Sequence, residues 1–230
     1  MNTRPLIEVI KKCARFFGCD IVMYRPCLEV IQKENFDLVL DIGANEGQFG
    51  RELRESGFTK NIISIEPVKH AYNILKKSID GDSLWDCYNI ALGKENGTAI
   101  LNIHEDTRLS SFLEHNKLPS REMQVQVKKL SSFLEEIGCD AEKIFIKIDT
   151  QGYEMPILEG VGEFWHRIHG ALVELSIAPL YKKQIPLEEM IAYLKKHGLL
   201  LWSLRRGCYD RQIMRDLEVD GLFMKKDQSM

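Results

Sequence analysis

"LVLDIGANEGQFG", Leu38 to Gly50, is the stretch of the sequence that decides the fold. An apolar run ends in an acid, Asp41, and two glycines follow it, Gly43 and Gly47. This pattern is typical of a buried strand that brings its backbone to a ligand, because glycine takes positive φ angles and lets a ligand approach closely. The stretch therefore predicts a strand, a ligand-binding turn and a helix in succession.

The same alternation continues along the chain. Further strands are expected at "NIISIEP", "WDCYNIAL", "IFIKIDTQG" and "ALVELS", with helices over 48–56, about 68–79 and 186–198. Apolar strands separated by helices indicate a parallel sheet that is covered on both faces. "LLLWSL" and "DGLFMKK" close the chain as two more strands, antiparallel because no helix lies between them. Ser132 and Glu135 fit a capping box and predict a short helix that starts there.

The middle of the chain interrupts this alternation. "GTAILNIHE" and "MQVQVKKL" are short strand-like segments, and they flank the polar stretch "DTRLSSFLEHNKLPS". The composition of that stretch is typical of a loop. We expect an inserted β-hairpin region beside the ligand-binding edge of the sheet.

Length and charge bound the class of protein. The 230 residues predict one α/β domain over 35–230, preceded by an N-terminal amphipathic helical segment over 1–34. In that segment apolar residues recur at helical spacing between Leu6 and Phe17. We expect this helix to pack on the domain, and the alternative is that it contacts a membrane or a partner. The net charge of −3, with 31 basic and 34 acidic residues, argues against a nucleic-acid-binding protein.

Two absences in the sequence point to the compartment. The six cysteines have no C-x-x-C spacing, which favours free thiols over a zinc site. No run reaches the roughly 18 apolar residues of a transmembrane segment, and the first 20 residues lack the unbroken apolar core of a signal peptide. We expect a cytoplasmic protein.

The glycine turn favours one class of ligand. Its spacing is G-x-x-x-G and departs from the G-x-G-x-x-G of dinucleotide-binding folds. A carboxylate at Asp41 would repel a pyrophosphate and attract an ammonium or a sulfonium group. Glu66 ends the second strand, where an acid can accept both hydroxyls of a ribose. Together these residues predict a nucleoside that carries positive charge, such as S-adenosylmethionine.

The order of these motifs resembles the FkbM-type S-adenosylmethionine-dependent methyltransferases. The resemblance runs from Phe36 to Met224, and "KIDTQGYE" followed by "ILEG" is its most specific part. It implies a Rossmann-like class I methyltransferase fold, with a seven-stranded, mostly parallel sheet, helices on both faces and an antiparallel last strand. It also implies O-methylation of a sugar, glycan or secondary-metabolite hydroxyl.

The resemblance also implies which residues bind the cofactor. One group would shape the methionine side of the site, a second would hold the ribose, and a third would flank the adenine: Asp41, Gly43, Ala44, Asn45 and Gly47; Glu66 and Pro67; and Asn89, Ala91 and Leu92. The sequence departs from the usual family pattern at one position, since "DTQGYE" stands where "DVEGAE" is common. Gln151 thus replaces an acid, which puts in question any role that needs a carboxylate there.

Candidate catalytic residues come from the ends of the fourth and fifth strands. Asp149 and Glu174 are expected beside the methyl group, either as the base that takes the hydroxyl proton or as ligands of a divalent cation such as Mg²⁺. Alternatively, Asp149 satisfies backbone amides and Glu174 pairs with an arginine. His104 is another candidate base. Further residues are candidates for binding the acceptor: Ser110, Ser111, Tyr153 and Tyr181.

Two other functions compete with this prediction. A non-catalytic binding module would not need the carboxylates of Asp41 and Glu66, so it is the weaker alternative. A protein or RNA methyltransferase is disfavoured, because the chain has no N-P-P-Y-like motif and no basic patch. We expect a small-molecule or glycan acceptor, whose identity the sequence does not specify.

Overall fold

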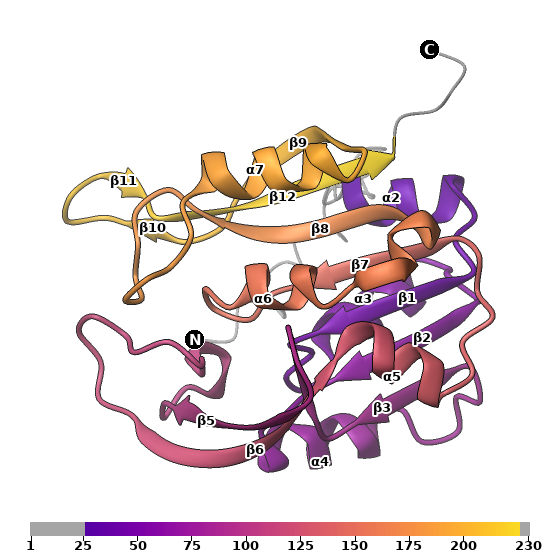
Figure 1. The fold of residues 1–230 in the computed structure, drawn as a ribbon, viewed down its shortest axis with the longest axis horizontal. Coiled ribbons are helices and arrows are strands. Elements are labelled where there is room, and N and C mark those ends of the chain that lie inside the picture. Colours follow the sequence, from indigo (N-terminus) through magenta and orange to yellow (C-terminus); the bar gives the residue numbers. More distant parts are fainter. Residues whose placement is uncertain (1–25, 226–230) are drawn as a thin grey trace, which may run out of the picture.

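A seven-stranded sheet forms the centre of the protein, in the order β3-β2-β1-β7-β8-β12-β9 (Figure 1). The structure is a computed structural model that describes residues 26–225. The helix expected between Leu6 and Phe17 lies outside these residues. The strands span Leu38–Ile42 (β1), Asn61–Ile65 (β2), Trp85–Tyr88 (β3), Ile144–Ile148 (β7), Ile168–Ser176 (β8), Leu199–Arg206 (β9) and Glu218–Lys225 (β12).

The strand directions confirm the predicted fold class. Strands β3, β2, β1, β7 and β8 are parallel to one another. The last strand, β12, is antiparallel to both β8 and β9. This is the mostly parallel seven-stranded sheet with an antiparallel last strand that characterises the class I methyltransferase fold.

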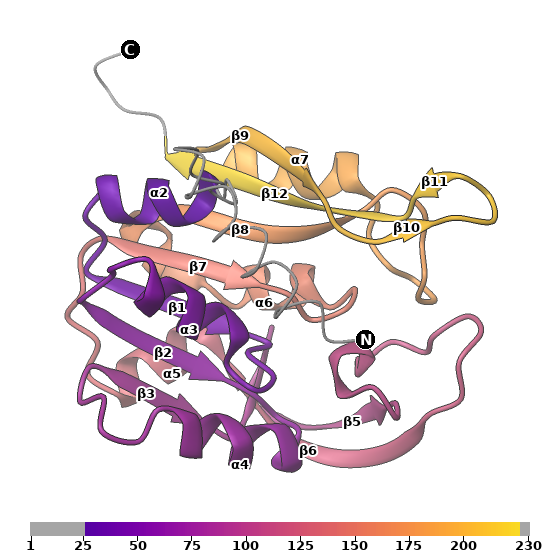
Figure 2. The same ribbon diagram turned by 180° about the vertical axis from the view of Figure 1, so that it is seen from behind.

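Helices of the described part of the chain cover both faces of the sheet (Figures 1 and 2). One face carries α2 (Pro26–Lys33), α3 (Gln48–Glu55) and α4 (Lys69–Ser78). The other face carries α5 (Leu130–Glu136), α6 (Glu154–Glu159) and α7 (Leu187–Lys196). A short 3-10 helix, η2 (Gly162–Arg167), precedes β8. No helix within residues 26–225 is long and apolar enough to cross a membrane.

The core follows from the alternation of side chains along the central strands. On β1, Leu38 and Leu40 pack with the α5–α7 face, whereas Val39 packs with the α2–α4 face. Side chains in a strand point alternately to opposite faces, so Asp41 shares the face of Val39. On β7 the same rule puts Lys147 on the side of Phe145, which belongs to that core too. One acid and one base are thus buried on the same face.

The inserted region forms a second, three-stranded sheet of order β4-β6-β5. Its strands are Ala91–Gly93 (β4), Gly97–Ile103 (β5) and Arg121–Lys129 (β6), with a 3-10 helix, η1, at Thr107–Leu109 in the long β5–β6 connection. This confirms the inserted hairpin. It lies beyond the carboxyl ends of the parallel strands (Figure 1). A small hairpin of β10 (Tyr209–Asp210) and β11 (Arg215–Asp216) lies beyond the same edge, at the β12 end of the sheet (Figure 1).

Three details of the prediction were wrong. The segment "WDCYNIAL" is two strands, because the chain leaves the main sheet after Tyr88 and β4 pairs with β6. The capping box is absent: α5 starts at Leu130, and Ser132 lies within it, where its Oγ accepts a hydrogen bond from Asn96 at 3.2 Å. The last predicted helix begins one residue later than expected, since Pro186 is its N-cap.

Candidate cofactor and acceptor site

A cavity of about 560 Å³ lies beyond the carboxyl ends of β1, β2, β7 and β8. Open α/β sheets bind their ligands at this edge. Two parts of the chain contribute residues that border the cavity. We call Asp41–Gly47 with Glu66–Val68 the glycine-turn region, and Asp149–Glu154 with Glu174 the carboxylate region.

The glycines of the first region are required by their surroundings. Gly43 has φ +76°, and a Cβ atom there would lie 2.0 Å from the carbonyl oxygen of Asp149. Gly47 has φ +83°, and a Cβ atom there would lie 2.6 Å from Leu75 Cδ1. The turn is fixed to β2 by Gly43 and Ala44, whose N–H groups donate to the Ile65 carbonyl at 3.0 and 3.1 Å. The backbone of the turn therefore reaches the cavity in a single conformation.

Glu66 is buried at the end of β2 and lines the cavity. Its Oε2 accepts the N–H of Asn45 at 2.8 Å, and its Oε1 accepts the N–H of Val68 at 2.7 Å. Burial raises the pKa of Glu66 to about 7. Each carboxylate oxygen can still accept another hydrogen bond. The geometry gives Glu66 a fixed orientation with acceptor capacity left for a ligand.

Two asparagines hold this region in place. Asn45 Nδ2 donates to Thr107 Oγ1 at 2.9 Å, which ties η1 of the inserted region to the glycine turn. Asn89 Nδ2 donates to the carbonyls of Glu66 and Pro67, both at 2.9 Å. Asn89 therefore supports the loop that carries Glu66 and does not line the cavity, whereas Pro67, Ala91 and Leu92 do.

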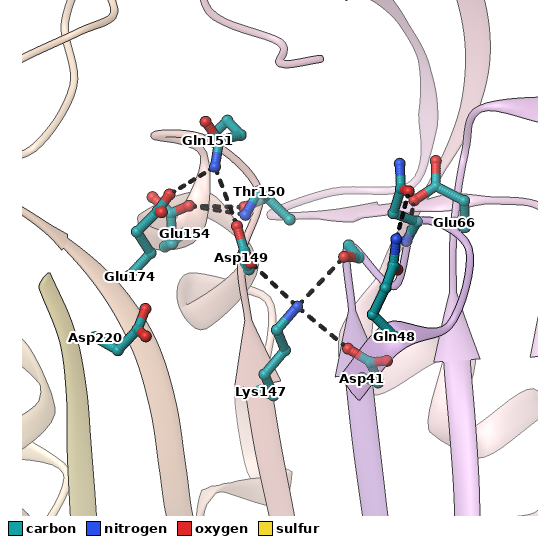
Figure 3. A network of polar contacts seen from close by, with 12 residues as sticks. Asp41, Gln48, Glu66, Lys147, Asp149, Thr150, Gln151, Glu154, Glu174 and Asp220 are labelled. Atoms are coloured by element: carbon teal, nitrogen blue, oxygen red, sulfur yellow. Dashed lines mark hydrogen bonds and ion pairs between the residues drawn. The ribbon is translucent and has the colours of Figure 1, made fainter. Parts of the chain in front are cut away.

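Lys147 connects the two regions (Figure 3). Its Nζ lies 3.3 Å from Asp41 Oδ1 and 3.3 Å from Asp149 Oδ2. Asp41 and Lys147 are direct neighbours across β1 and β7. Burial would lower the pKa of Lys147, but Asp149 and Asp41 raise it above its ordinary value, so the ammonium stays charged. Asp41 lies beneath the cavity and neutralises Lys147, in place of the direct contact with a ligand cation that the sequence suggested.

Lys147 was not identified from the sequence, although a signal was present. It is the one charged residue in the strand "IFIKI", whose other side chains are apolar and buried. A buried lysine requires a carboxylate partner. Asp41, the one charged residue of the neighbouring strand "LVLDI", was the available candidate.

The carboxylate region is built around Gln151. Its Nε2 donates to Asp149 Oδ1 at 3.1 Å and to Glu174 Oε2 at 2.9 Å (Figure 3). Asp149 is 42% exposed, whereas burial and several neighbouring carboxylates hold the pKa of Glu174 well above its ordinary value. Glu218 and Asp220 of β12 also line this end of the cavity. Neither was identified from the sequence, because the sequence of the last strand does not show which strand it pairs with, and therefore does not show whether its acids lie at the cavity.

Glu154 has a structural position at the start of α6. Its Oε1 accepts three hydrogen bonds, from Thr150 N at 3.0 Å, Thr150 Oγ1 at 3.1 Å and Gly152 N at 3.1 Å. Burial raises the pKa of Glu154 to about 7. This carboxylate fixes the turn that presents Asp149 and Gln151 to the cavity.

The candidate acceptor-binding residues divide into two groups. Ser110 lines the cavity. The others lie behind its wall: Ser111 donates to the Gln151 carbonyl at 2.7 Å, the Tyr153 ring is tilted against the Phe112 ring with centroids 4.5 Å apart, and Tyr181 is almost fully buried. None of these three residues borders the cavity.

His104 lies away from the cavity. It is buried in the inserted region, with Nδ1 2.7 Å from the Pro119 carbonyl oxygen, and its ring packs edge-on against His115 at 5.7 Å. It does not border the cavity. This position weakens its candidacy as a base relative to Asp149 and Glu174, both of which line the cavity.

Within residues 26–225, no three side chains of histidine, cysteine, aspartate or glutamate are grouped as ligands of a metal ion. The residues do suit S-adenosylmethionine. Glu66 has free acceptor capacity, and the cavity volume lies within the usual range for cofactor sites. Apolar side chains form one wall of the cavity, which suits a purine ring: Val68, Ala91, Leu92 and Leu101.

The fold and this cavity together define an S-adenosylmethionine-dependent methyltransferase of class I. The chain belongs to the FkbM methyltransferase family, because the family model described as "Methyltransferase FkbM domain" matches residues 41–201. Among curated proteins, "Methyltransferase 1" of Beauveria bassiana (strain ARSEF 2860) is 24% identical over 170 residues, 65% of this chain and 68% of that protein. "Methyltransferase sdnD" of Sordaria araneosa is 24% identical over 212 residues, 75% of this chain and 82% of that protein.

Solved structures of methyltransferases align with most of the chain at low identity. The magnesium protoporphyrin IX methyltransferase of Synechocystis PCC 6803, with bound SAM, covers 87% of this chain and 76% of its own at 8% identity, with a TM-score of 0.49. TrmK of M. capricolum, in complex with S-adenosyl-homocysteine, covers 91% of this chain and 73% of its own at 12% identity, with a TM-score of 0.46.

Proposed function

We propose that this methyltransferase acts on a hydroxyl group of a sugar, glycan or secondary metabolite, with Asp149 as the base. The observation that carries the proposal is the position of Asp149. Asp149 follows directly after β7 and lines the cavity, its side chain is partly exposed, and its backbone carbonyl lies next to Gly43. A hydroxyl is a poor nucleophile near neutral pH, so a positioned base is required.

The chemistry assigns a role to each group. S-adenosylmethionine supplies a methyl group on a positively charged sulfur. Asp149 accepts the hydroxyl proton as the oxygen–carbon bond forms, and the ammonium of Lys147, 3.3 Å away, stays beside it. The glycine turn and Glu66 hold the donor side, so that acceptor oxygen and methyl meet in line. Positioning and proton removal together account for the catalysis.

Charge at the acceptor end limits the class of acceptor. Asp149, Glu174, Glu218 and Asp220 line the cavity there, and Arg205 pairs with Asp220 at 2.6 Å. Carboxylates repel phosphate groups. This supports a neutral, hydroxyl-rich acceptor and argues against RNA, the runner-up among substrates.

The test is a methyl-transfer screen with isotope-labelled S-adenosylmethionine against glycan and small-molecule fractions. Once an acceptor is found, Asp149→Asn should lower the rate by ~10²–10⁴-fold, the usual contribution of a positioned base. The affinity for S-adenosylmethionine should change little. Asp80→Asn, at an exposed position after α4, is the matched control and should retain full activity.

Two results would contradict the proposal. If Asp149→Asn transfers methyl at the wild-type rate, Asp149 is not the base, and Glu174 becomes the next residue to test. If EDTA abolishes activity and Mg²⁺ restores it, then a metal ion activates the hydroxyl, in place of a carboxylate base.

The proposal also includes a cytoplasmic location and a boundary after residue 34, between the N-terminal helical segment and the methyltransferase domain. Cys87, Cys139 and Cys208 are free thiols, as expected in a reducing compartment.

A further inference from the structure

Gln151 occupies an unusual place for a neutral side chain. It is buried, and its backbone has φ +56° in the turn between β7 and α6. Non-glycine residues rarely adopt this conformation, and it clusters at functional sites. Its carbonyl oxygen accepts a hydrogen bond from Ser111 Oγ at 2.7 Å. The inserted region thus helps to hold the backbone of Gln151 in this conformation.

The side chain of Gln151 makes a hydrogen bond with each of three other residues. Nε2 donates to Asp149 at 3.1 Å and to Glu174 at 2.9 Å, while Oε1 lies 2.9 Å from the Tyr181 hydroxyl. These partners determine how the amide is oriented. In the opposite orientation Oε1 would face the carboxylates of Asp149 and Glu174, so that three acceptors would face one another without a donor. The NH₂ group would then lie beside the Tyr181 hydroxyl.

Tyr181 strengthens this arrangement from behind. Its ring is 1% exposed, and its hydroxyl lies 3.0 Å from the Leu109 carbonyl as well as near Gln151. Burial raises the pKa of Tyr181, so the hydroxyl stays protonated and remains a donor. The orientation of the amide is therefore held from both ends.

An amide at this position differs from an acid in one important way. Gln151 bridges Asp149 and Glu174 without adding charge. Within residues 26–225, Lys147 makes ion pairs with Asp41 and Asp149 and makes none with Glu174. An acid at 151 would place three carboxyl groups within hydrogen-bonding distance. Like charges that close cannot all ionise, so one group would have to retain a proton near neutral pH.

We propose that Gln151 is a positioning residue that holds the carboxylates of Asp149 and Glu174 in one orientation and leaves Asp149 free to take the acceptor proton. The catalytic consequence rests on the proposed function, whereas the positioning itself does not. Gln151 acts through its two carboxylate neighbours and need not contact the acceptor.

The test compares Gln151→Glu with the wild type by NMR titration of ¹³C-labelled side-chain carboxyl groups, without any acceptor. Gln151→Glu keeps the shape of the side chain and adds a third acid. The titration of Glu174 should move to still higher pH by ~1 unit or more, as expected for strongly interacting acids. Gln124→Glu is the matched control: the same change at an exposed site on β6 should leave Glu174 unchanged.

A second variant covers the case in which Gln151→Glu does not fold. Gln151→Met keeps the length and removes the hydrogen bonds, so it releases both carboxylates without adding charge. In the wild type, Asp149→Asn should change the titration of Glu174; in the Gln151→Met background this effect should be much smaller. An unchanged Glu174 titration in folded Gln151→Glu, or undiminished coupling in Gln151→Met, overturns the proposal.

Activity separates this inference from the proposed function. With an acceptor in hand, Gln151→Glu should shift the pH dependence of kcat to higher pH, with little change in KM for S-adenosylmethionine. If the carboxyl titrations shift as expected but Asp149→Asn remains fully active, the positioning role stands and the assignment of the base fails.

Discussion

The two sides of the cavity are built in different ways. In the glycine-turn region most of the hydrogen bonds involve backbone: Glu66 accepts the N–H groups of Asn45 and Val68, and Gly43 donates to the Ile65 carbonyl. In the carboxylate region the central contacts join side chains. Gln151 contacts Asp149, Glu174 and Tyr181, which come from separate parts of the chain.

This difference reflects what each side binds. Every S-adenosylmethionine molecule is the same, and a backbone turn of fixed shape can bind it without depending on many side chains. The acceptor differs among methyltransferases, and side chains can be exchanged without rebuilding a strand or a turn. The comparison therefore predicts that changes in the glycine-turn region act on cofactor binding, while those in the carboxylate region act on the chemistry.

The largest expected effect comes from Gly43→Ala, at the contact between the two regions. The new Cβ would lie 2.0 Å from the Asp149 carbonyl oxygen, at a φ of +76°. The strain of the left-handed backbone conformation and the clash with the Asp149 backbone should together lower the free energy of unfolding by about 2–5 kcal/mol. We expect a lower melting temperature and loss of cofactor binding, measured by calorimetry.

Gly81→Ala is the matched control for this change. Gly81 also has a positive φ, +89°, but a Cβ there meets nothing within 4 Å. Gly81→Ala should lower the free energy of unfolding by about 1–2 kcal/mol, from backbone strain alone, and should leave the affinity for the cofactor intact. Equal losses in the two variants would show that the close approach of Gly43 to Asp149 is unimportant.

Glu66→Ala should have the next largest effect. It removes a carboxylate that lines the cavity and should weaken S-adenosylmethionine by ~1.5–3 kcal/mol, the range for hydrogen bonds to a charged group. Glu154→Ala is the control, because it removes an equally buried acceptor of backbone N–H groups from the carboxylate region. If both variants weaken cofactor binding alike, the two regions are not separate in function.

The smallest effect is a dependence of cofactor affinity on pH. Because the pKa of Glu66 is raised to about 7, its ionised form is lost below neutral pH. If that form accepts the ribose hydroxyls, S-adenosylmethionine should bind about tenfold more weakly at pH 6 than at pH 8. Glu66→Gln should abolish this dependence, and Glu154→Gln should preserve it, although the pKa of Glu154 is also about 7.

The stability of the protein should change with pH in the opposite direction to the cofactor affinity: it should fall as the pH rises. A carboxyl whose pKa is higher in the folded state binds its proton more tightly there, so its contribution to stability is complete below the ordinary value of 4.5. That contribution is lost as the pH rises toward about 7. Thermal melts of the protein without cofactor between pH 4.5 and 8 measure this trend, and Glu66→Gln with Glu154→Gln should flatten it.

The fold could be predicted because its signals are local. "LVLDI" and "IFIKI" are short apolar runs, each followed by a glycine or acid at a strand end, and the helices between them forced a parallel sheet. The errors arose where tertiary contacts overrode local pattern. "WDCYNIAL" has strand composition throughout, yet the pairing of β4 with β6 splits it in two.

The candidate residues show the same limit. Asp149 and Glu174 follow from their positions at the ends of neighbouring strands, and both border the cavity. Ser111 and Tyr181 were as plausible from the sequence, but the structure turns both behind the wall. Their types indicate that they form hydrogen bonds and do not indicate to which partner.

The sequence by itself determined the sheet, the glycine turn and the buried acid at the end of β2, because these depend on backbone conformation and on burial over a few consecutive residues. The tertiary structure alone decided that Lys147 joins Asp41 to Asp149, and that Gln151 joins Asp149 to Glu174. In each case one of the partners comes from a distant part of the chain: Gln151 and Glu174 are separated by 23 positions. The packing of strands and loops brings them within hydrogen-bonding distance, and no local pattern encodes that proximity.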